Sequence, residues 1–130
     1  MVNAVNQLRK DTESIIDVNP SLLFFIRRER EKNAYGNVRE VEKRTEIQRV
    51  RIAEISHSET DRLLQEGLLK THIVNITAPH DADIQAGDLF DFQGSRYEVV
   101  FIRKITIGGY APENAYKMSG RAKEIQEAAE

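Results

Sequence analysis

The clearest alternation of polar and apolar residues lies in the second half of the chain, over residues 88–102. Within residues 88–92, Phe90 and Phe92 fall on one face of an extended strand, because successive side chains of a strand point to opposite faces. Residues 96–102 are rich in aromatic and β-branched side chains, and Gly94, in the short segment before them, is suited to a positive φ. The pattern predicts a β-hairpin whose phenylalanines face a core.

Two segments carry helical patterns instead. Apolar positions at spacings near three and four, including Leu8 and Ile15, predict a helix over residues 2–17 that ends at Asn19-Pro20. A helix of this length is marginal alone, so its stripe must pack either on the chain's own β-domain or on a neighbouring chain. A second, short helix is predicted over residues 58–69, where Ser58 fits an N-cap.

Shorter apolar and β-branched runs predict the remaining strands, and glycine, asparagine and proline mark the turns between them. The predicted strands are residues 21–32, 47–55, 71–77, 104–107 and 116–122, and the predicted turns are residues 33–37 and 78–83. Residues 38–45 are dense in both signs of charge, which favours a solvated ribbon or loop over a binding patch.

Several short strands with one small inserted helix predict a mainly β fold with small α additions, either a bent sheet or a small β-barrel. A chain of 130 residues suffices for one core. The expected organisation is an N-terminal helical arm over residues 1–19, a small β-barrel domain over residues 20–123, and a flexible C-terminal end over residues 124–130.

Composition narrows the functional classes. With 31% charged residues and a net charge of −2, the chain suits neither a disordered tail nor a strongly basic DNA binder. It contains no cysteine, which excludes disulfides, thiolate nucleophiles and cysteine-based zinc sites. The longest apolar run, residues 22–26, is far shorter than the roughly 20 residues of a membrane span, and no signal peptide is evident, so we expect an unsecreted protein without a membrane anchor.

The sequence gives only weak support for a metal site. His80, Asp81 and Asp83 could in principle approach a divalent metal together with His72, but turn carboxylates commonly serve local hydrogen bonding, and no second cluster completes a coordination sphere. We therefore expect no metal site, no cofactor and no small-molecule substrate.

The nearest candidates for catalysis are a histidine beside a serine and a pair of hairpin aspartates. Ser58, next to His57, is better explained as a helix cap, and Asp88 and Asp91 as surface residues of the hairpin. No catalytic residue is predicted, and an enzyme is the least favoured class.

A small barrel that binds single-stranded nucleic acid is a further alternative. Such a protein stacks bases on exposed aromatic side chains. The pattern instead assigns the phenylalanines to the core: Phe24, Phe25, Phe90, Phe92 and Phe101. Acidic residues also alternate with the basic ones of residues 27–51, which cancels most of the field beyond a Debye length of about 8 Å.

The order of the elements, with Asp83-Ile84, Gly87-Asp88, Gly94 and Tyr97-Glu98-Val99, resembles the head–tail joining proteins (head-completion or stopper proteins) of tailed bacteriophages and prophages. The resemblance implies a structural subunit of a homo-oligomeric ring beneath the portal or its adaptor. Such a ring closes the DNA-filled head, joins it to tail proteins, and can contact the packaged DNA without sequence specificity. The implied location is the neck of the virion, after assembly in the bacterial cytoplasm. A minor tail or tail-terminator protein is the related alternative.

A subunit of a closed ring needs two different surfaces for its neighbours and further loops for the layers above and below. We expect the helix residues Leu8 and Ile15 to dock a neighbouring component. Either the charged segment 39–46 or the segment 57–70 is expected to face the channel. The candidate assembly residues are Leu8, Ile15, Arg39, Arg44, Leu64 and Leu68.

Overall fold

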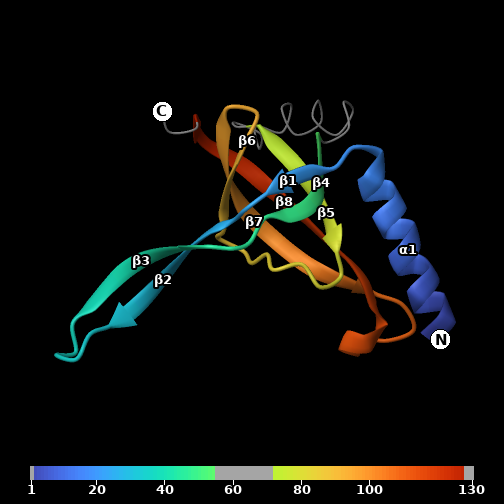
Figure 1. The fold of residues 1–130 in the computed structure, drawn as a ribbon, viewed down its shortest axis with the longest axis horizontal. Coiled ribbons are helices and arrows are strands. Elements are labelled where there is room, and N and C mark those ends of the chain that lie inside the picture. Colours follow the sequence, from blue (N-terminus) through green and yellow to red (C-terminus); the bar gives the residue numbers. More distant parts are fainter. Residues whose placement is uncertain (1, 55–71, 128–130) are drawn as a thin grey trace, which may run out of the picture.

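The computed structural model describes residues 2–54 and 72–127, and the side chains of residues 4–54 and 72–125. It confirms a mainly β fold: in the described residues, eight strands form one curled, half-barrel sheet, and one long helix, α1 (Val2–Val18), lies beside it (Figure 1). The other elements are β1 (Ser21–Leu23), β2 (Ile26–Lys32), β3 (Val38–Arg44), β4 (Gln48–Glu54), β5 (Ile73–Pro79), β6 (Leu89–Phe92), β7 (Ser95–Thr106), the 3₁₀ turn η1 (Pro112–Asn114) and β8 (Ala115–Glu127).

The predicted single strand over residues 21–32 is wrong, because Phe24 and Phe25 are not in a strand and separate β1 from β2. The sheet order is β1-β4-β5-β8-β7-β6-β2-β3, so these two residues connect strands that lie far apart in the sheet. The sheet must therefore curl back on itself, and β1 contacts β6 across the open side. Phe25 turns fully inward at this corner and is completely buried.

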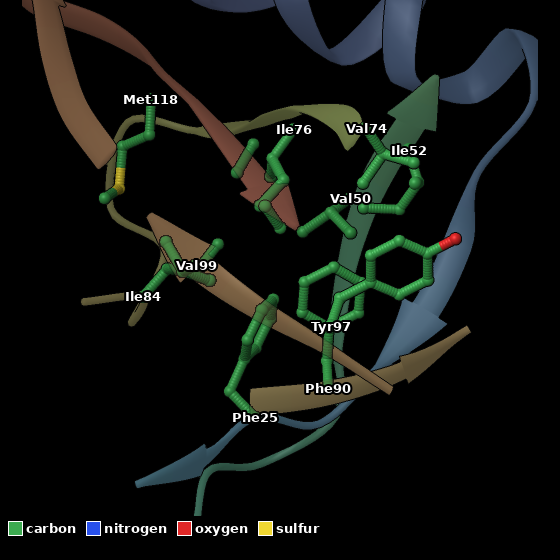
Figure 2. Close-up of a cluster of buried hydrophobic side chains, with 12 residues drawn as sticks. Phe25, Val50, Ile52, Val74, Ile76, Ile84, Phe90, Tyr97, Val99 and Met118 are labelled. Atoms are coloured by element: carbon green, nitrogen blue, oxygen red, sulfur yellow. The ribbon is translucent and has the colours of Figure 1, made fainter. Parts of the chain in front are cut away.

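The core fills the inside of the curl, and Figure 2 shows its side chains converging from strands on several sides. Phe90 packs edge-on against Phe25 and stacks on Tyr97, each at a centroid distance of 5.4 Å. The predicted hairpin is confirmed as β6 and β7, and its turn places Gln93 and Gly94 at φ values of 51° and 80°. Phe90 is fully buried and Phe92 half-buried, as the alternation indicates.

A β-bulge in β7 reverses the alternation after Val99. Val99 pairs with Ala122, but the next paired residue is Phe101, opposite Arg121, so β7 gains one residue at this point. Ile102 then packs against the core, while Val100 and Phe101 are 51% and 45% exposed. The prediction that Phe101 faces the core is wrong for this reason.

Helix α1 packs on the outer face of the sheet, where it contacts β4, β5 and β8. Its buried residues Val5, Thr12 and Ile16 lie at helical spacing, and Arg9 donates hydrogen bonds to the carbonyl oxygens of Ala115 and Glu113. Of the two alternatives that the sequence leaves open, the structure therefore shows the stripe packed on the chain's own β-domain.

The C-terminal end that the sequence predicts to be flexible, residues 124–130, begins within strand β8. Strand β8 continues to Glu127 because its last residues pair with the start of β7, from Tyr97 opposite Glu124 to Ser95 opposite Glu127. The N–H of Glu124 also donates to the carbonyl oxygen of His72 at 2.8 Å. Residues 128–130 and the predicted helix over residues 58–69 lie outside the described residues.

Candidate functional site

Strands β2 and β3 form a two-stranded ribbon that projects from the half-barrel (Figure 1). Residue pairs join the two strands from Ile26 and Arg44 at the base to Lys32 and Val38 near the tip, whereas β2 pairs with β6 at Ile26. Most of the ribbon is exposed, as predicted for a solvated ribbon. It carries two candidate assembly residues, Arg39 near the tip and Arg44 at the base.

The turn at the tip of the ribbon is ordered by Asn33. Its side-chain oxygen accepts hydrogen bonds from the backbone N–H groups of Tyr35 and Asn37, at 2.9 and 3.0 Å, and Gly36 takes a φ of 80°. Tyr35 stands at this tip with 90% of its surface exposed. A turn is therefore confirmed at residues 33–37, with an aromatic side chain at its end.

The two faces of the ribbon carry charge differently. On one face, the Lys43 ammonium lies 2.9 Å from Glu29 and 3.3 Å from Glu31, and the hydrogen bonds that it donates to these two carboxylates raise the pKa of Lys43. The other face presents the exposed basic residues of β2, namely Arg28, Arg30 and Lys32. One face thus carries a lysine paired with two glutamates, and the other carries Arg28 and Arg30 opposite Glu42 and Glu40, with Lys32 near the tip.

An ion-pair cluster fixes the base of the ribbon to the half-barrel. Arg27 donates to both carboxylate oxygens of Asp88, at 3.0 and 2.8 Å, and its guanidinium lies 2.9 Å from Asp83. Asp88 is almost completely buried, and its carboxylate also accepts the N–H of Gln85 at 2.8 Å. Hydrogen bonding to Asp88 is the main reason that the pKa of Arg27 is raised, so Arg27 remains a cation. We call Arg27, Asp83 and Asp88 the clamp.

The structure corrects the interpretation of one hairpin aspartate and supports that of the other. Asp88 is not a surface residue of the hairpin, because its carboxylate is turned inward to meet Arg27. Asp91 is exposed as predicted and pairs with Arg96, whose hydrogen bond lowers the pKa of Asp91.

The loop that contains Asp83-Ile84 and Gly87-Asp88 has a structural role. The Gln48 side chain donates to the Asp83 carbonyl oxygen at 2.8 Å and accepts the Asp83 N–H at 2.7 Å. Ile84 is buried in the core, and Gly87, at a φ of 91°, donates to the carbonyl oxygen of Val99. The sequence motif therefore builds the support beneath the ribbon.

The other predicted assembly residues are distributed as follows. Leu8 is half-buried on α1, and Ile15 is 48% exposed near its C-terminus. Leu64, Leu68 and the whole segment 57–70 lie outside the described residues. The structure thus places Arg39 and Arg44 on the ribbon and Leu8 and Ile15 on the helix, without bringing the two pairs together.

Two further titratable side chains, His72 and Tyr97, lie close together at one end of the sheet. His72 lies 3.3 Å from Glu54, and burial raises the pKa of Tyr97. Within residues 2–54 and 72–127, no three histidine or acidic side chains are grouped to hold a metal ion. No helix in that part of the chain has the length and hydropathy to cross a bilayer.

Sequence reasoning missed the clamp and several exposed apolar side chains. The only sequence signal for the clamp is a glycine before Asp88 in a turn that leads into a strand, and nothing in the sequence links that turn to Arg27. The outward side chains of Val100 and Phe101 depend on the bulge, which leaves no signature in the alternation.

Comparison with models of known protein families gives no match, and comparison with curated proteins gives none either. The candidate surfaces are therefore interpreted from their own geometry.

Proposed function

We propose that this chain is a structural subunit of the head–tail connector of a tailed phage or prophage. In this role it forms a ring under the portal or its adaptor, closes the DNA-filled head and joins it to the tail. The observation that carries the proposal is the charged ribbon of β2 and β3, projected from a small half-barrel and held at its base by the clamp.

A ring subunit needs a compact body and an element that reaches beyond it. The body here is the half-barrel, whose core is closed by Phe25 at the corner between β1 and β2. The ribbon is held in one direction because Arg27 binds Asp88 with two hydrogen bonds in a buried setting, where charged hydrogen bonds are strong. A projecting element with a fixed direction suits contact with a neighbouring subunit or with the contents of a channel.

The charge of the ribbon fits a place beside DNA without sequence recognition. Arg28, Arg30 and Lys32 alternate along β2 and so share one face, at a spacing of about 7 Å. Such a row can approach phosphates electrostatically, and the interaction weakens with salt. Glu40 and Glu42 on β3 lie opposite Arg30 and Arg28, which moderates the attraction and suits DNA that must pass.

The test is disruption of the gene in the phage or prophage that carries it, with complementation from a plasmid. We expect electron micrographs to show separate tails and heads that lose their DNA, and we expect the wild-type copy to restore joined particles. A complementing copy with residues 29–41 replaced by a two-residue hairpin turn should leave heads and tails unjoined. Normal, infectious particles without the gene would overturn the proposal.

The same micrographs distinguish the related alternative. A minor tail or tail-terminator protein would give filled, stable heads together with tails of abnormal length or with defective ends. A connector subunit gives complete tails that fail to join, because the missing layer lies between the head and a finished tail.

The nucleic-acid-binding alternative gains one observation from the structure, since Tyr35, Phe101 and Tyr110 are 90%, 45% and 98% exposed. These rings belong to three separate places: the ribbon tip, the middle of β7, and the loop between β7 and η1. A stacking platform needs successive rings along one groove. The ribbon and clamp therefore favour the connector.

A further inference from the structure

Three apolar side chains lie exposed where the end of α1 meets the edge of the sheet. Val18, Leu22 and Ile47 are 80%, 69% and 68% exposed. Leu22 pairs with Arg49, a neighbour in β4 of the fully buried Val50, so both Leu22 and Arg49 point away from the core. We call Val18, Leu22 and Ile47 the apolar edge.

Acidic residues border the apolar edge. A hollow of about 280 Å³ is lined by Ile47 and Gln48 together with Glu46, Asp81 and Asp83. Asp83 is engaged by Arg27 in the clamp, whereas Glu46 and Asp81 are exposed. Arg49, the nearby cation of β4, is paired with Asp17 of α1. This surface therefore has an apolar centre with an acidic border.

A second apolar surface is created by the bulge in β7, with Val100 and Phe101 at its centre. The same outer face carries basic residues: Arg103 follows on β7, and Lys117 lies on β8 opposite Ile105. Arg121, opposite Phe101, already donates a hydrogen bond to Asn75 at 3.2 Å. Glu98, an acidic residue close to this surface, is paired with Lys123 at 3.7 Å. We call Val100, Phe101, Arg103, Lys117 and Arg121 the bulge face.

The two surfaces point to different sides of the molecule. β4 and β7 both contribute inward side chains to one core, such as Val50 and Val99, yet β5 and β8 lie between them in the sheet. Since the sheet curls around that core, the outer faces of β4 and β7 diverge. Helix α1 lies over β4, β5 and β8, between the two surfaces.

We infer that the bulge face of one copy of this chain docks on the apolar edge of the next copy. The apolar centres meet and the basic border faces the acidic one, which is the arrangement of a specific interface with electrostatic complementarity. A contact between two different surfaces on diverging sides is heterologous, and repeated contacts of this kind form a ring when the rotation from one copy to the next closes. The inference rests on the ring assembly proposed above and names its subunit contact.

The experiment measures the mass of the purified full chain by light scattering over a range of concentrations. Leu22→Glu and Phe101→Glu each place a charge in one of the two exposed apolar surfaces. Each variant should raise the protein concentration at which half of the chains are assembled by at least about tenfold. Tyr110→Glu is the control, because Tyr110 is 98% exposed outside both surfaces and should leave assembly unchanged. Circular dichroism and thermal melting check that all variants remain folded.

Mixing the two variants tests the pairing itself. Phe101→Glu retains its apolar edge and Leu22→Glu its bulge face, so an equimolar mixture should form a heterodimer that grows no further. Reversing the charge of one residue in each border gives a second test. Glu46→Arg and Arg103→Glu should each weaken assembly, and the variant with both substitutions should recover it.

Three results would overturn the inference: a wild-type chain that stays monomeric at millimolar concentration, assembly that is insensitive to both apolar variants, or a mixture that forms no heterodimer. These results are independent of the gene-disruption experiment. If heads and tails fail to join without the gene but assembly ignores Leu22 and Phe101, only the contact is wrong. If the contact behaves as inferred but particles form without the gene, only the connector role is wrong.

Discussion

Asp88 shows how one residue connects the half-barrel to the ribbon. Its carboxylate is nearly inaccessible to solvent and accepts two hydrogen bonds from Arg27 and one from the Gln85 N–H. A buried charge is tolerated only when it is paired and hydrogen-bonded, and both conditions hold here. The pair therefore fixes a direction for the ribbon as well as contributing to stability.

We predict that Asp88→Asn lowers the free energy of unfolding by about 2 kcal/mol or more, because Arg27 loses its buried counter-charge. Arg27→Ala should cost more, since it leaves the Asp88 carboxylate buried without its cation. Asp91→Asn is the matched control: that side chain is 40% exposed, and its loss should cost less than about 1 kcal/mol. Urea unfolding measures all three, and equal effects of Asp88→Asn and Asp91→Asn would contradict the prediction.

Gly120 is a second residue on which the fold depends. A Cβ at this position would lie 2.2 Å from the carbonyl oxygen of Phe101 and 2.8 Å from Cδ1 of Ile102. We expect Gly120→Ala to destabilise the protein by more than about 2 kcal/mol, because backbone must move to make room. Ser119→Ala, at the neighbouring position of β8, should be nearly neutral in the same urea titration; similar losses in both variants would argue against the close approach.

At the scale of elements, the β6–β7 hairpin combines a buried and an exposed face. Phe90 and Tyr97 form its core side, and Asp91 and Arg96 pair across its outer side at 2.8 Å. The hydrogen bond from Arg96 lowers the pKa of Asp91 below the ordinary aspartate value. A carboxyl group whose pKa is lower in the folded than in the unfolded state stabilises the fold at pH values above its unfolded-state pKa. This contribution is lost as the pH falls through its folded-state pKa.

We therefore predict a small pH-dependent difference between the wild type and Asp91→Asn. The wild type should be more stable by less than about 1 kcal/mol near neutral pH, because the pair is partly exposed. The difference should shrink as the pH falls below the ordinary carboxyl pKa of about 4, and it should vanish once the pH is below the lowered pKa of Asp91. Thermal melts over this range of pH measure it. A difference that grows on acidification has the wrong sign for this pair.

The packing of α1 on the sheet determines what a deletion of the helix can show. Because Val5 and Ile16 are buried against the chain's own sheet, we expect deletion of residues 1–17 to lower the melting temperature as well as any assembly. Ile15→Glu is the better probe of an assembly role, since Ile15 is 48% exposed and the variant should melt like the wild type. If the deletion leaves the melting temperature unchanged, the helix does not contribute to the stability of the half-barrel.

At the scale of the whole molecule, we expect the half-barrel to fold without the projecting part of the ribbon. The contacts of the ribbon with the half-barrel gather at its base, through Ile26 opposite Leu89 and through the clamp. Replacing residues 29–41 with a two-residue turn should therefore leave the melting temperature within a few degrees of the wild-type value. Large destabilisation would show that the ribbon belongs to the folding core rather than projecting from it.

Much of this architecture follows from local sequence. The spacing of Val5, Leu8 and Ile16 predicts α1, the alternation around Phe90 with Gly94 predicts the β6–β7 hairpin, and Asn33 and Gly36 predict the turn of the ribbon. The split of residues 21–32 into two strands was not predictable. It depends on whether the chain continues to pair with β4 or crosses to pair with β6. The residues of β4 and β6 that determine this pairing are far away in the sequence.

The sequence by itself determined the mainly β class, the helix and the hairpin, because these depend on periodicity and turn chemistry within a few residues. Only the tertiary structure decided that Arg27 meets Asp88 across 61 positions, that a bulge turns Phe101 outward, and that α1 packs on its own sheet. Each of these depends on contacts between residues far apart in the chain: the pairing of β2 with β6, the register shift between β7 and β8, and the packing of α1 on β4, β5 and β8. The surfaces proposed here for assembly exist because of such contacts.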